Sequence, residues 1–145
     1  MSKNVILYCR VSSDEQAQNS SLDYQEETMR EYCRRKQYNI IDCYKEDYSA
    51  KTFVNRPEIN KVMKYCKTHK KAVDLILCLN WSRYSRSAKA AYENLDYFKK
   101  LDVEVNTTEQ PIDHHQPEQK LLLAIYLAQA EVDNDIRGNI PKREL

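Results

Sequence analysis

The chain has 145 residues, of which 41% are hydrophobic and 31% charged, and its 23 basic and 22 acidic side chains leave a formal net charge of +1. This size and composition are typical of one soluble globular domain, and the near-neutral charge excludes the bulk basic surface that dominates nonspecific nucleic-acid binding. No apolar run approaches the roughly 20 residues that span a bilayer, and residues 1–4 lack the apolar core of a signal peptide, so we expect a cytoplasmic protein.

Strand and helix patterns alternate along the chain. In chain order, we expect a strand over 4–10, a helix over about 21–37, a strand over 39–44, a helix over about 57–70, a strand over 73–79, a helix over about 86–101, a strand over 103–106 and a helix over about 118–137. This alternation predicts an α/β fold with a mostly parallel central sheet of four or five strands flanked by helices.

Particular residues support these boundaries. Ser20 or Ser21 is placed to cap the first helix, and Pro57 suits the first turn of the second. The strand over 73–79 is nearly all apolar, as in the centre of a parallel sheet. The segment 46–55 is expected to be a polar loop.

The last helix is apolar almost all round. Nine of the ten residues from Leu121 to Ala130 are apolar, and only Gln129 is polar. A helix stripe normally covers one core, so this helix has a second face to bury, either in the same core or against a partner subunit. Gly138 and Pro141 then suit a helix stop, and we expect the chain to be part of a longer protein.

The cysteines and histidines do not indicate a metal site. Five cysteines, an odd number, include no CxxC pair and mostly fall in apolar segments, so buried reduced thiols are expected. No cysteine or histidine stands at zinc-site spacing from His69, His114 or His115.

Two arginine clusters follow predicted strands. Arg10 ends the first strand, Ser12 and Ser13 follow it, and the segment Trp81–Arg86 follows the third strand. Ligands of open α/β sheets bind at the carboxyl ends of the strands. A serine nucleophile beside several guanidinium groups suits phosphoryl transfer, because serine forms esters and guanidinium groups match phosphate oxygens.

Other interpretations of these residues stay open. A serine at a strand end is more often a helix cap or a turn residue, and Arg83 and Arg86 have acidic candidates for surface ion pairs in Asp47, Asp74 and Glu46. No arginine stands six residues after any cysteine, and a single glycine excludes a P-loop. A serine-dependent phosphate-ester hydrolase is not excluded.

Several motifs together resemble the serine recombinase family of resolvases, invertases and large serine integrases. The segments that carry the resemblance, in chain order, are Tyr8–Gln16, Ser21–Gln25, Glu46–Ser49, Asn55–Pro57, Trp81–Arg86 and Ala124–Arg137. The resemblance covers residues 4–137, which is nearly the whole chain, and the motifs occur in the same order.

The resemblance implies a role for each matching residue. Ser12 would attack a DNA phosphodiester, giving a 5′-phosphoserine and a free 3′-hydroxyl. Arg10, Arg83 and Arg86 would hold the scissile phosphate. The residues implied to bind or position at the phosphate site are Tyr8, Gln16, Gln25, Asp47, Ser49 and Arg56. No metal or other cofactor is implied, the partner would be double-stranded DNA, and the protein would be a homodimer that forms a tetramer in the synaptic complex.

The resemblance also implies a division of the chain and exposes two departures. Residues 1–117 would be the catalytic domain, and 118–145 the start of a long oligomerisation helix, with a DNA-binding region beyond it that this chain lacks. Ser82 stands where the family usually has aspartate, and Ala50 where it often has glycine. The alternative function is therefore a catalytically impaired DNA-regulatory or oligomerisation module of the same fold.

Overall fold

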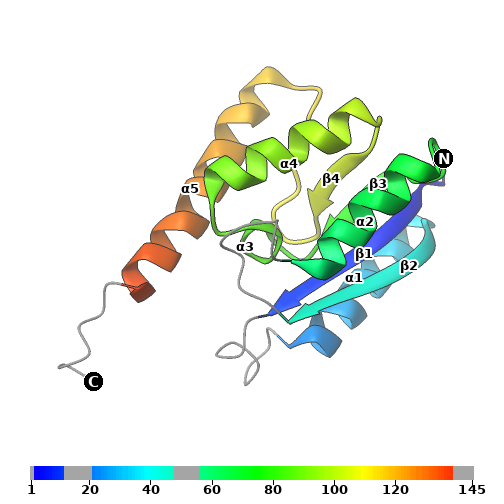
Figure 1. The fold of residues 1–145 in the computed structure, drawn as a ribbon, viewed down its shortest axis with the longest axis horizontal. Coiled ribbons are helices and arrows are strands. Elements are labelled where there is room, and N and C mark those ends of the chain that lie inside the picture. Colours follow the sequence, from blue (N-terminus) through cyan, green and yellow to red (C-terminus); the bar gives the residue numbers. More distant parts are fainter. Residues whose placement is uncertain (1, 12–20, 48–55, 139–145) are drawn as a thin grey trace.

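The computed structural model describes residues 2–11, 21–47 and 56–138, without the side chains of 134–138. In chain order, the elements are β1 (Asn4–Val11), α1 (Leu22–Lys36), β2 (Asn39–Asp47), α2 (Pro57–Thr68), β3 (Leu75–Cys78), α3 (Trp81–Tyr84), α4 (Ala88–Lys100), β4 (Glu104–Thr107) and α5 (Pro117–Gly138) (Figure 1). The predicted alternation of strands and helices is confirmed.

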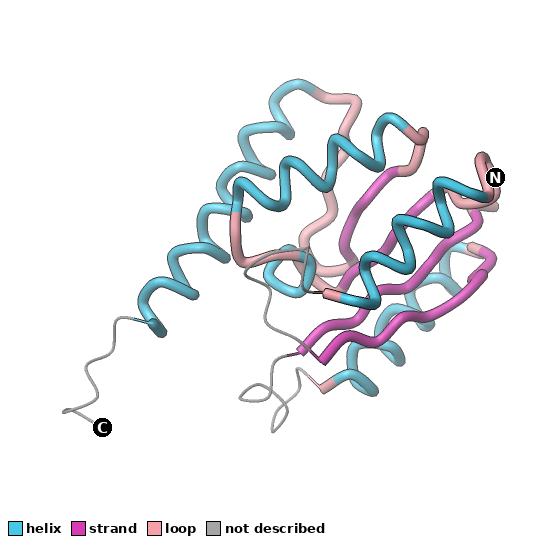
Figure 2. Tube along the Cα trace, viewed as in Figure 1, coloured by secondary structure: helices cyan, strands magenta, loops and turns pink. Residues whose placement is uncertain are grey.

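The strands form one parallel sheet in the order β2-β1-β3-β4. Helix α1 covers one face of this sheet, and α2 and α4 lie on the other (Figures 1 and 2). The expected α/β fold, with a parallel sheet flanked by helices, is therefore confirmed, with four strands among the described residues.

Alternate residues of β1 face the two layers of the core. Val5 and Leu7 pack in the cluster that α1 covers, whereas Ile6 and Tyr8 belong to the larger cluster on the opposite face. Because side chains alternate along a strand, this period places the side chain of Arg10 on the same face as Tyr8. The side chain of Arg10 therefore lies on the face of the sheet that α3 contacts.

The parallel register brings the carboxyl ends of β1 and β2 to the same edge. Arg10 is opposite Glu46, and Val11 is opposite Asp47. This pairing corrects the expected polar loop over 46–55, because β2 continues through its first two residues. The strand extends since β1 provides a hydrogen-bonding partner at those positions.

The elements around α3 also differ in detail from the prediction. The helix expected over about 86–101 is α4, and a separate single turn, α3, precedes it. The strand expected over 73–79 is the shorter β3. Ser21 caps α1 as expected, since its hydroxyl accepts a hydrogen bond from the backbone N–H of Tyr24 at 3.2 Å, whereas Ser20 lies outside the described residues.

Helix α5 has one buried and one exposed apolar stripe. Leu123, Leu127 and Ala130 are buried against the core. Three large apolar side chains on the other side are more than half exposed: Leu121, Ile125 and Val132. The core of this chain therefore does not bury the whole apolar surface of α5. No helix in the described part of the chain has the length and apolar character needed to cross a membrane.

Candidate active site

Arg10 is wholly buried near the end of β1, and its backbone is held by α1. Its N–H donates to Gln25 Oε1 at 3.1 Å, and Gln25 Nε2 donates to its carbonyl oxygen at 3.0 Å. The ladder with β3 includes only Val5–Leu7, so the buried amide of Gln25 serves the backbone of β1 beyond the end of that ladder. This reciprocal pair fixes Gln25 of α1 against Arg10.

The guanidinium group of Arg10 binds the end of α3. Its Nε donates to the carbonyl oxygen of Arg83 at 3.0 Å, and its Nη2 donates to that of Ser82 at 2.9 Å. The last carbonyl groups of a helix have no partners within the helix and carry partial negative charge. Arg10 therefore acts as a cationic cap that holds the segment bearing Arg83.

Arg56 makes the same kind of contact from a different element. It is wholly buried at the start of α2, and its Nη2 donates to the carbonyl oxygen of Tyr84 at 2.7 Å. Together, Arg10 and Arg56 bind three consecutive carbonyl groups, those of residues 82–84. Two arginines that were predicted to contact a phosphate thus also position α3.

Tyr8 connects Arg56 to a buried acidic residue. Its hydroxyl accepts from Nε and Nη2 of Arg56, at 3.1 and 2.6 Å, and donates to Glu46 Oε1 at 3.0 Å. Burial raises the pKa of Tyr8 well above its ordinary value, although the nearby charge of Arg56 opposes that shift. The phenol therefore stays protonated and can donate to Glu46 throughout the neutral range.

Glu46 is a buried neighbour of the predicted site residues to which the sequence analysis assigned no role in the site. Its side chain is buried, and its Oε2 and Oε1 accept the backbone N–H groups of Glu58 and Ile59 at 3.0 and 3.1 Å. The N-cap residue of α2, Arg56, makes no side-chain capping bond, so this carboxylate caps the helix from β2. Continued strand alternation from Tyr44 to Glu46 is the signal that could have placed it on the inner face.

The other end of α3 is also fixed. Asn80 caps it by accepting the N–H of Arg83 at 3.2 Å, and the hydroxyl of Ser82 donates to Asn80 Oδ1 at 2.7 Å. The indole Nε1 of Trp81 donates to the carbonyl oxygen of Gln110 at 3.0 Å. The hydroxyl at the position where the related family usually has aspartate thus joins the cap of α3.

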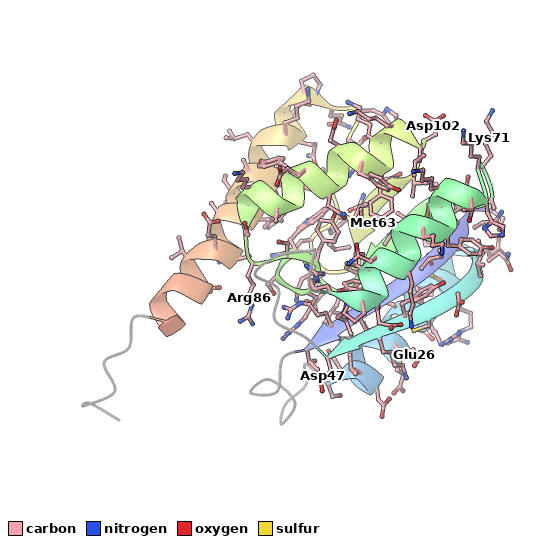
Figure 3. All side chains as sticks on the ribbon, in the orientation of Figure 1. Glu26, Asp47, Met63, Lys71, Arg86 and Asp102 are labelled. Atoms are coloured by element: carbon pink, nitrogen blue, oxygen red, sulfur yellow. The ribbon has the colours of Figure 1, made fainter. Side chains whose placement is uncertain are left out.

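The predicted site residues divide into those the structure places and those outside it. Figure 3 labels Asp47 and Arg86 near the carboxyl edge of the sheet, and Arg83 and Arg86 are half-buried. Tyr8 is hydrogen-bonded to Arg56, and Arg10 is hydrogen-bonded to Gln25 and to the backbone of Arg83. Three predicted residues lie outside the described residues: Ser12, Gln16 and Ser49. In the described ranges, no group of three or more His, Cys, Asp or Glu side chains could hold a metal ion.

A comparison with protein families gives a match over almost the whole chain. The model of the family described as "Resolvase, N terminal domain" matches residues 5–143. The chain belongs to this family. The resemblance drawn from the sequence motifs is therefore confirmed, and a comparison with curated proteins finds no match.

Solved structures support the membership of this chain in the resolvase N-terminal domain family. The N-terminal catalytic domain of TP901-1 integrase is 25% identical, with a TM-score of 0.73 over 93% of this chain and 99% of that one. A resolvase family site-specific recombinase from Streptococcus pneumoniae is 28% identical, with a TM-score of 0.69 over 93% of this chain and 91% of that one. The protein thus has the fold of a serine recombinase catalytic domain.

Proposed function

We propose that this resolvase-family domain catalyses site-specific DNA recombination, with Ser12 as the nucleophile. One observation carries the proposal. At the carboxyl edge of the sheet, the buried guanidinium group of Arg10 donates a hydrogen bond to the backbone carbonyl oxygen of Arg83. Ser12 comes one residue after the end of β1 in the sequence. The two arginines and Val11, the residue before Ser12 in the sequence, thus lie at one edge of the sheet.

The proposed reaction is a transesterification. The Ser12 oxygen attacks the phosphorus of a DNA phosphodiester and loses its proton, while the 3′-oxygen leaves and gains one. The protein becomes linked to the 5′-phosphate, and the attack of a 3′-hydroxyl from the exchanged strand reverses the step. Because one phosphate ester replaces another, rejoining requires no nucleotide hydrolysis.

The arginines would provide the electrostatic stabilisation. Arg10, Arg83 and Arg86 would contact the scissile phosphate, where guanidinium groups stabilise charge that develops in the transition state. Arg56 and Tyr8 would support this site from beneath α3, in keeping with their contacts to Tyr84 and to each other. Gln16, Gln25, Asp47 and Ser49 would position these groups.

The proposed partners are double-stranded DNA and further copies of the chain. Residues 1–117 would form the catalytic domain, and 118–145 would begin the oligomerisation helix. The exposed stripe of Leu121, Ile125 and Val132 supports a homodimer through α5, because a partner helix would remove these side chains from water. Two dimers would form the tetrameric synapse, and the reaction would take place in the cytoplasm.

A covalent-adduct assay tests the chemistry. The protein expressed from its complete gene is mixed with DNA that flanks the gene, denatured and analysed on a gel. We expect an adduct from the wild type and from the Ser2→Ala control, but none from Ser12→Ala. An adduct that persists in Ser12→Ala and disappears in Ser13→Ala would assign the neighbouring hydroxyl instead.

One observation favours a second candidate function. Ser82 takes the place of the aspartate that is usual in the family, which suits a catalytically impaired DNA-regulatory or oligomerisation module. DNA binding without an adduct in the wild type, together with an adduct in Ser82→Asp, would establish that function. An adduct of equal yield from both proteins would exclude it.

A further inference from the structure

We propose that Glu46 is a positioning residue, which sets the place of α3 and its arginine through a relay formed by Tyr8 and Arg56. The inference rests on the proposed function only in that Arg83 serves the reaction. The relay itself is a physical claim about the fold. It can therefore be tested without DNA.

The first step of the argument is the burial of Glu46 among donors. Only 1% of its surface is exposed, and its carboxylate accepts from the Tyr8 hydroxyl and from the N–H groups of Glu58 and Ile59. A buried acidic group is stabilised when hydrogen bonds and an opposite charge replace water. These contacts come from β1 and α2, so they fix the carboxylate relative to both elements.

The second step is the direction of the Tyr8 hydroxyl. Its one proton is donated to Glu46, which leaves the oxygen lone pairs to accept from the guanidinium group of Arg56. The guanidinium carbon also lies 5.3 Å from the centre of the Tyr8 ring. Glu46 therefore orients a single hydroxyl that in turn orients Arg56.

The third step joins Arg56 to α3. Its Nη2 bonds both Tyr8 and the carbonyl oxygen of Tyr84, so one group links the relay to the last residue of that helix. A helix of four residues is far too short to be stable alone. Its position is consequently set by contacts with the rest of the protein, and the relay provides one of them.

Two substitutions separate the relay from the second role of Glu46. Glu46→Gln places an amide N–H donor among three groups that donate to Glu46: the Tyr8 hydroxyl and the N–H groups of Glu58 and Ile59. It therefore disturbs both the relay and the cap of α2. Tyr8→Phe removes the link but retains the bonds from Glu58 and Ile59 to Glu46. An effect that both variants share belongs to the relay. Glu58→Gln is the matched control, since it removes a carboxylate from the same turn of α2, where it pairs with Lys61.

The single tryptophan of the chain makes α3 observable. Trp81 is the first residue of α3 and is wholly buried, so its fluorescence reports on this helix alone. Emission and acrylamide quenching are measured well below the melting temperature of each variant. We expect a red-shifted emission and stronger quenching in Glu46→Gln and Tyr8→Phe, and wild-type behaviour in Glu58→Gln. The Tyr8→Phe/Glu46→Gln double variant should be quenched no more strongly than Glu46→Gln, because that single variant already disturbs the relay.

The adduct assay supplies the functional readout. We expect the rate of adduct formation to fall roughly 10- to 100-fold in both relay variants, because small displacements of catalytic groups have effects of this size. DNA affinity should stay within about twofold of the wild type, since catalytic positioning affects rate more than binding.

Two outcomes would overturn the proposal: unchanged quenching of Trp81 in Tyr8→Phe, or additive quenching in the double variant. If Glu46→Gln fails to fold, Tyr8→Phe alone decides. A wild type that forms no adduct would refute the proposed function, while the quenching data would still support or overturn the relay.

Discussion

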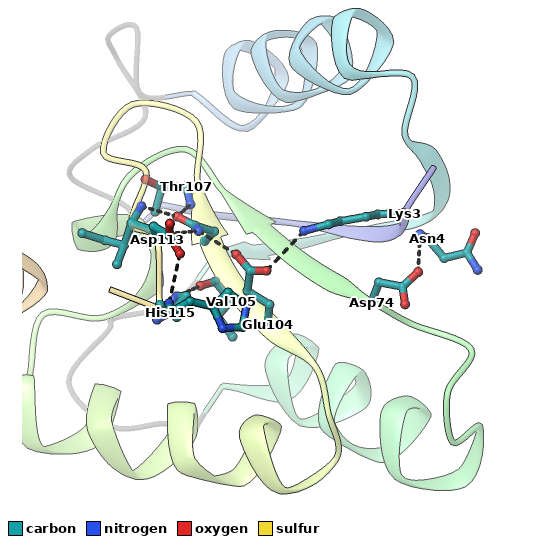
Figure 4. Close-up of polar contacts among 11 residues, drawn as sticks. Lys3, Asn4, Asp74, Glu104, Val105, Thr107, Asp113 and His115 are labelled. Atoms are coloured by element: carbon teal, nitrogen blue, oxygen red, sulfur yellow. Dashed lines mark hydrogen bonds and ion pairs between the residues drawn. The ribbon is translucent and has the colours of Figure 1, made fainter. Parts of the chain in front are cut away.

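Charged side chains lie at both ends of the parallel strands, but in the described part of the chain only those at the carboxyl ends are fully buried. At the carboxyl edge, Arg10, Glu46 and Arg56 are almost wholly inaccessible to water. At the amino edge, Lys3 and Glu104 form a 3.3 Å ion pair with side chains that are 41% and 32% exposed. Figure 4 shows this pair beside the contact of Asp74 with the backbone of Asn4. Basic and acidic side chains thus occur in two very different environments.

The difference shows what a buried charge requires. An exposed ion pair is partly solvated and screened, so losing it changes little. A buried charge lacks water, so each of its polar groups needs a partner with a fixed position. Three hydrogen bonds to Glu46 and three to carbonyl oxygens of α3 provide such partners, and they define geometry where catalysis would need it.

The largest effect that tests this contrast is expected from Arg56→Met. The substitution removes the buried positive charge that is joined to Glu46 through the Tyr8 hydroxyl, and it removes the donor to the carbonyl oxygen of Tyr84. We expect the free energy of unfolding to fall by about 3–5 kcal/mol, the usual result of removing one member of a buried charged network. Urea denaturation measures this change, with the same substitution at exposed Arg35 as the control. A loss similar to that of the control would show that burial does not distinguish the two edges.

A smaller loss is expected from Gln25→Leu. The variant places an apolar side chain of similar size in the buried position of Gln25. It leaves the backbone N–H and carbonyl groups of Arg10 without the amide that pairs with them. Since an unpaired buried polar group costs roughly 1–3 kcal/mol, we expect a loss of about 2–3 kcal/mol. Thermal and urea unfolding would measure it. Full retention of stability would mean that water replaces the amide and that this edge is more accessible than it is in the structure.

Alkaline pH provides a third test of burial at the end of β3. Burial raises the pKa of the Cys78 thiol from its ordinary 9.0 to about 12. Between these values the unfolded state loses the proton and the folded state retains it, so stability falls as the pH rises. From pH 8 to pH 10, the wild type should lose about 1.4 kcal/mol more than Cys78→Ala. Equal losses in urea titrations at the two pH values would contradict a buried thiol.

The smallest effect is expected at the amino edge. Lys3→Met removes an exposed partner of Glu104, and we expect the free energy of unfolding to change by less than about 1 kcal/mol. The change should shrink further at 1 M salt, where exposed charges are screened. Comparing urea midpoints at low and high salt measures both effects. A loss as large as that in Arg56→Met would remove the contrast between the two edges.

The sequence predicted the parts of this edge that depend on strand patterns. The apolar runs of the first and third strands were sufficient to place Arg10 at the end of one strand and Arg83 after another strand of the same sheet. Helix α3 was missed because four residues show no helical period. Glu46 was assigned to a loop because a charged residue ended the apolar pattern, and the contacts that bury it come from Tyr8 and α2, which are distant in sequence.

The motif segment around α3 could not be exchanged by itself between related proteins. Residues 80–87 carry the paired arginines, yet their backbone is held by Arg10, Arg56 and Gln110 from three other parts of the chain. A chimaera that takes only this segment from a relative would combine the relative's side chains with the Arg10, Arg56 and Gln110 contacts of this protein. Domain shuffling or protein engineering would therefore have to transfer the segment together with its anchors, as one dispersed module.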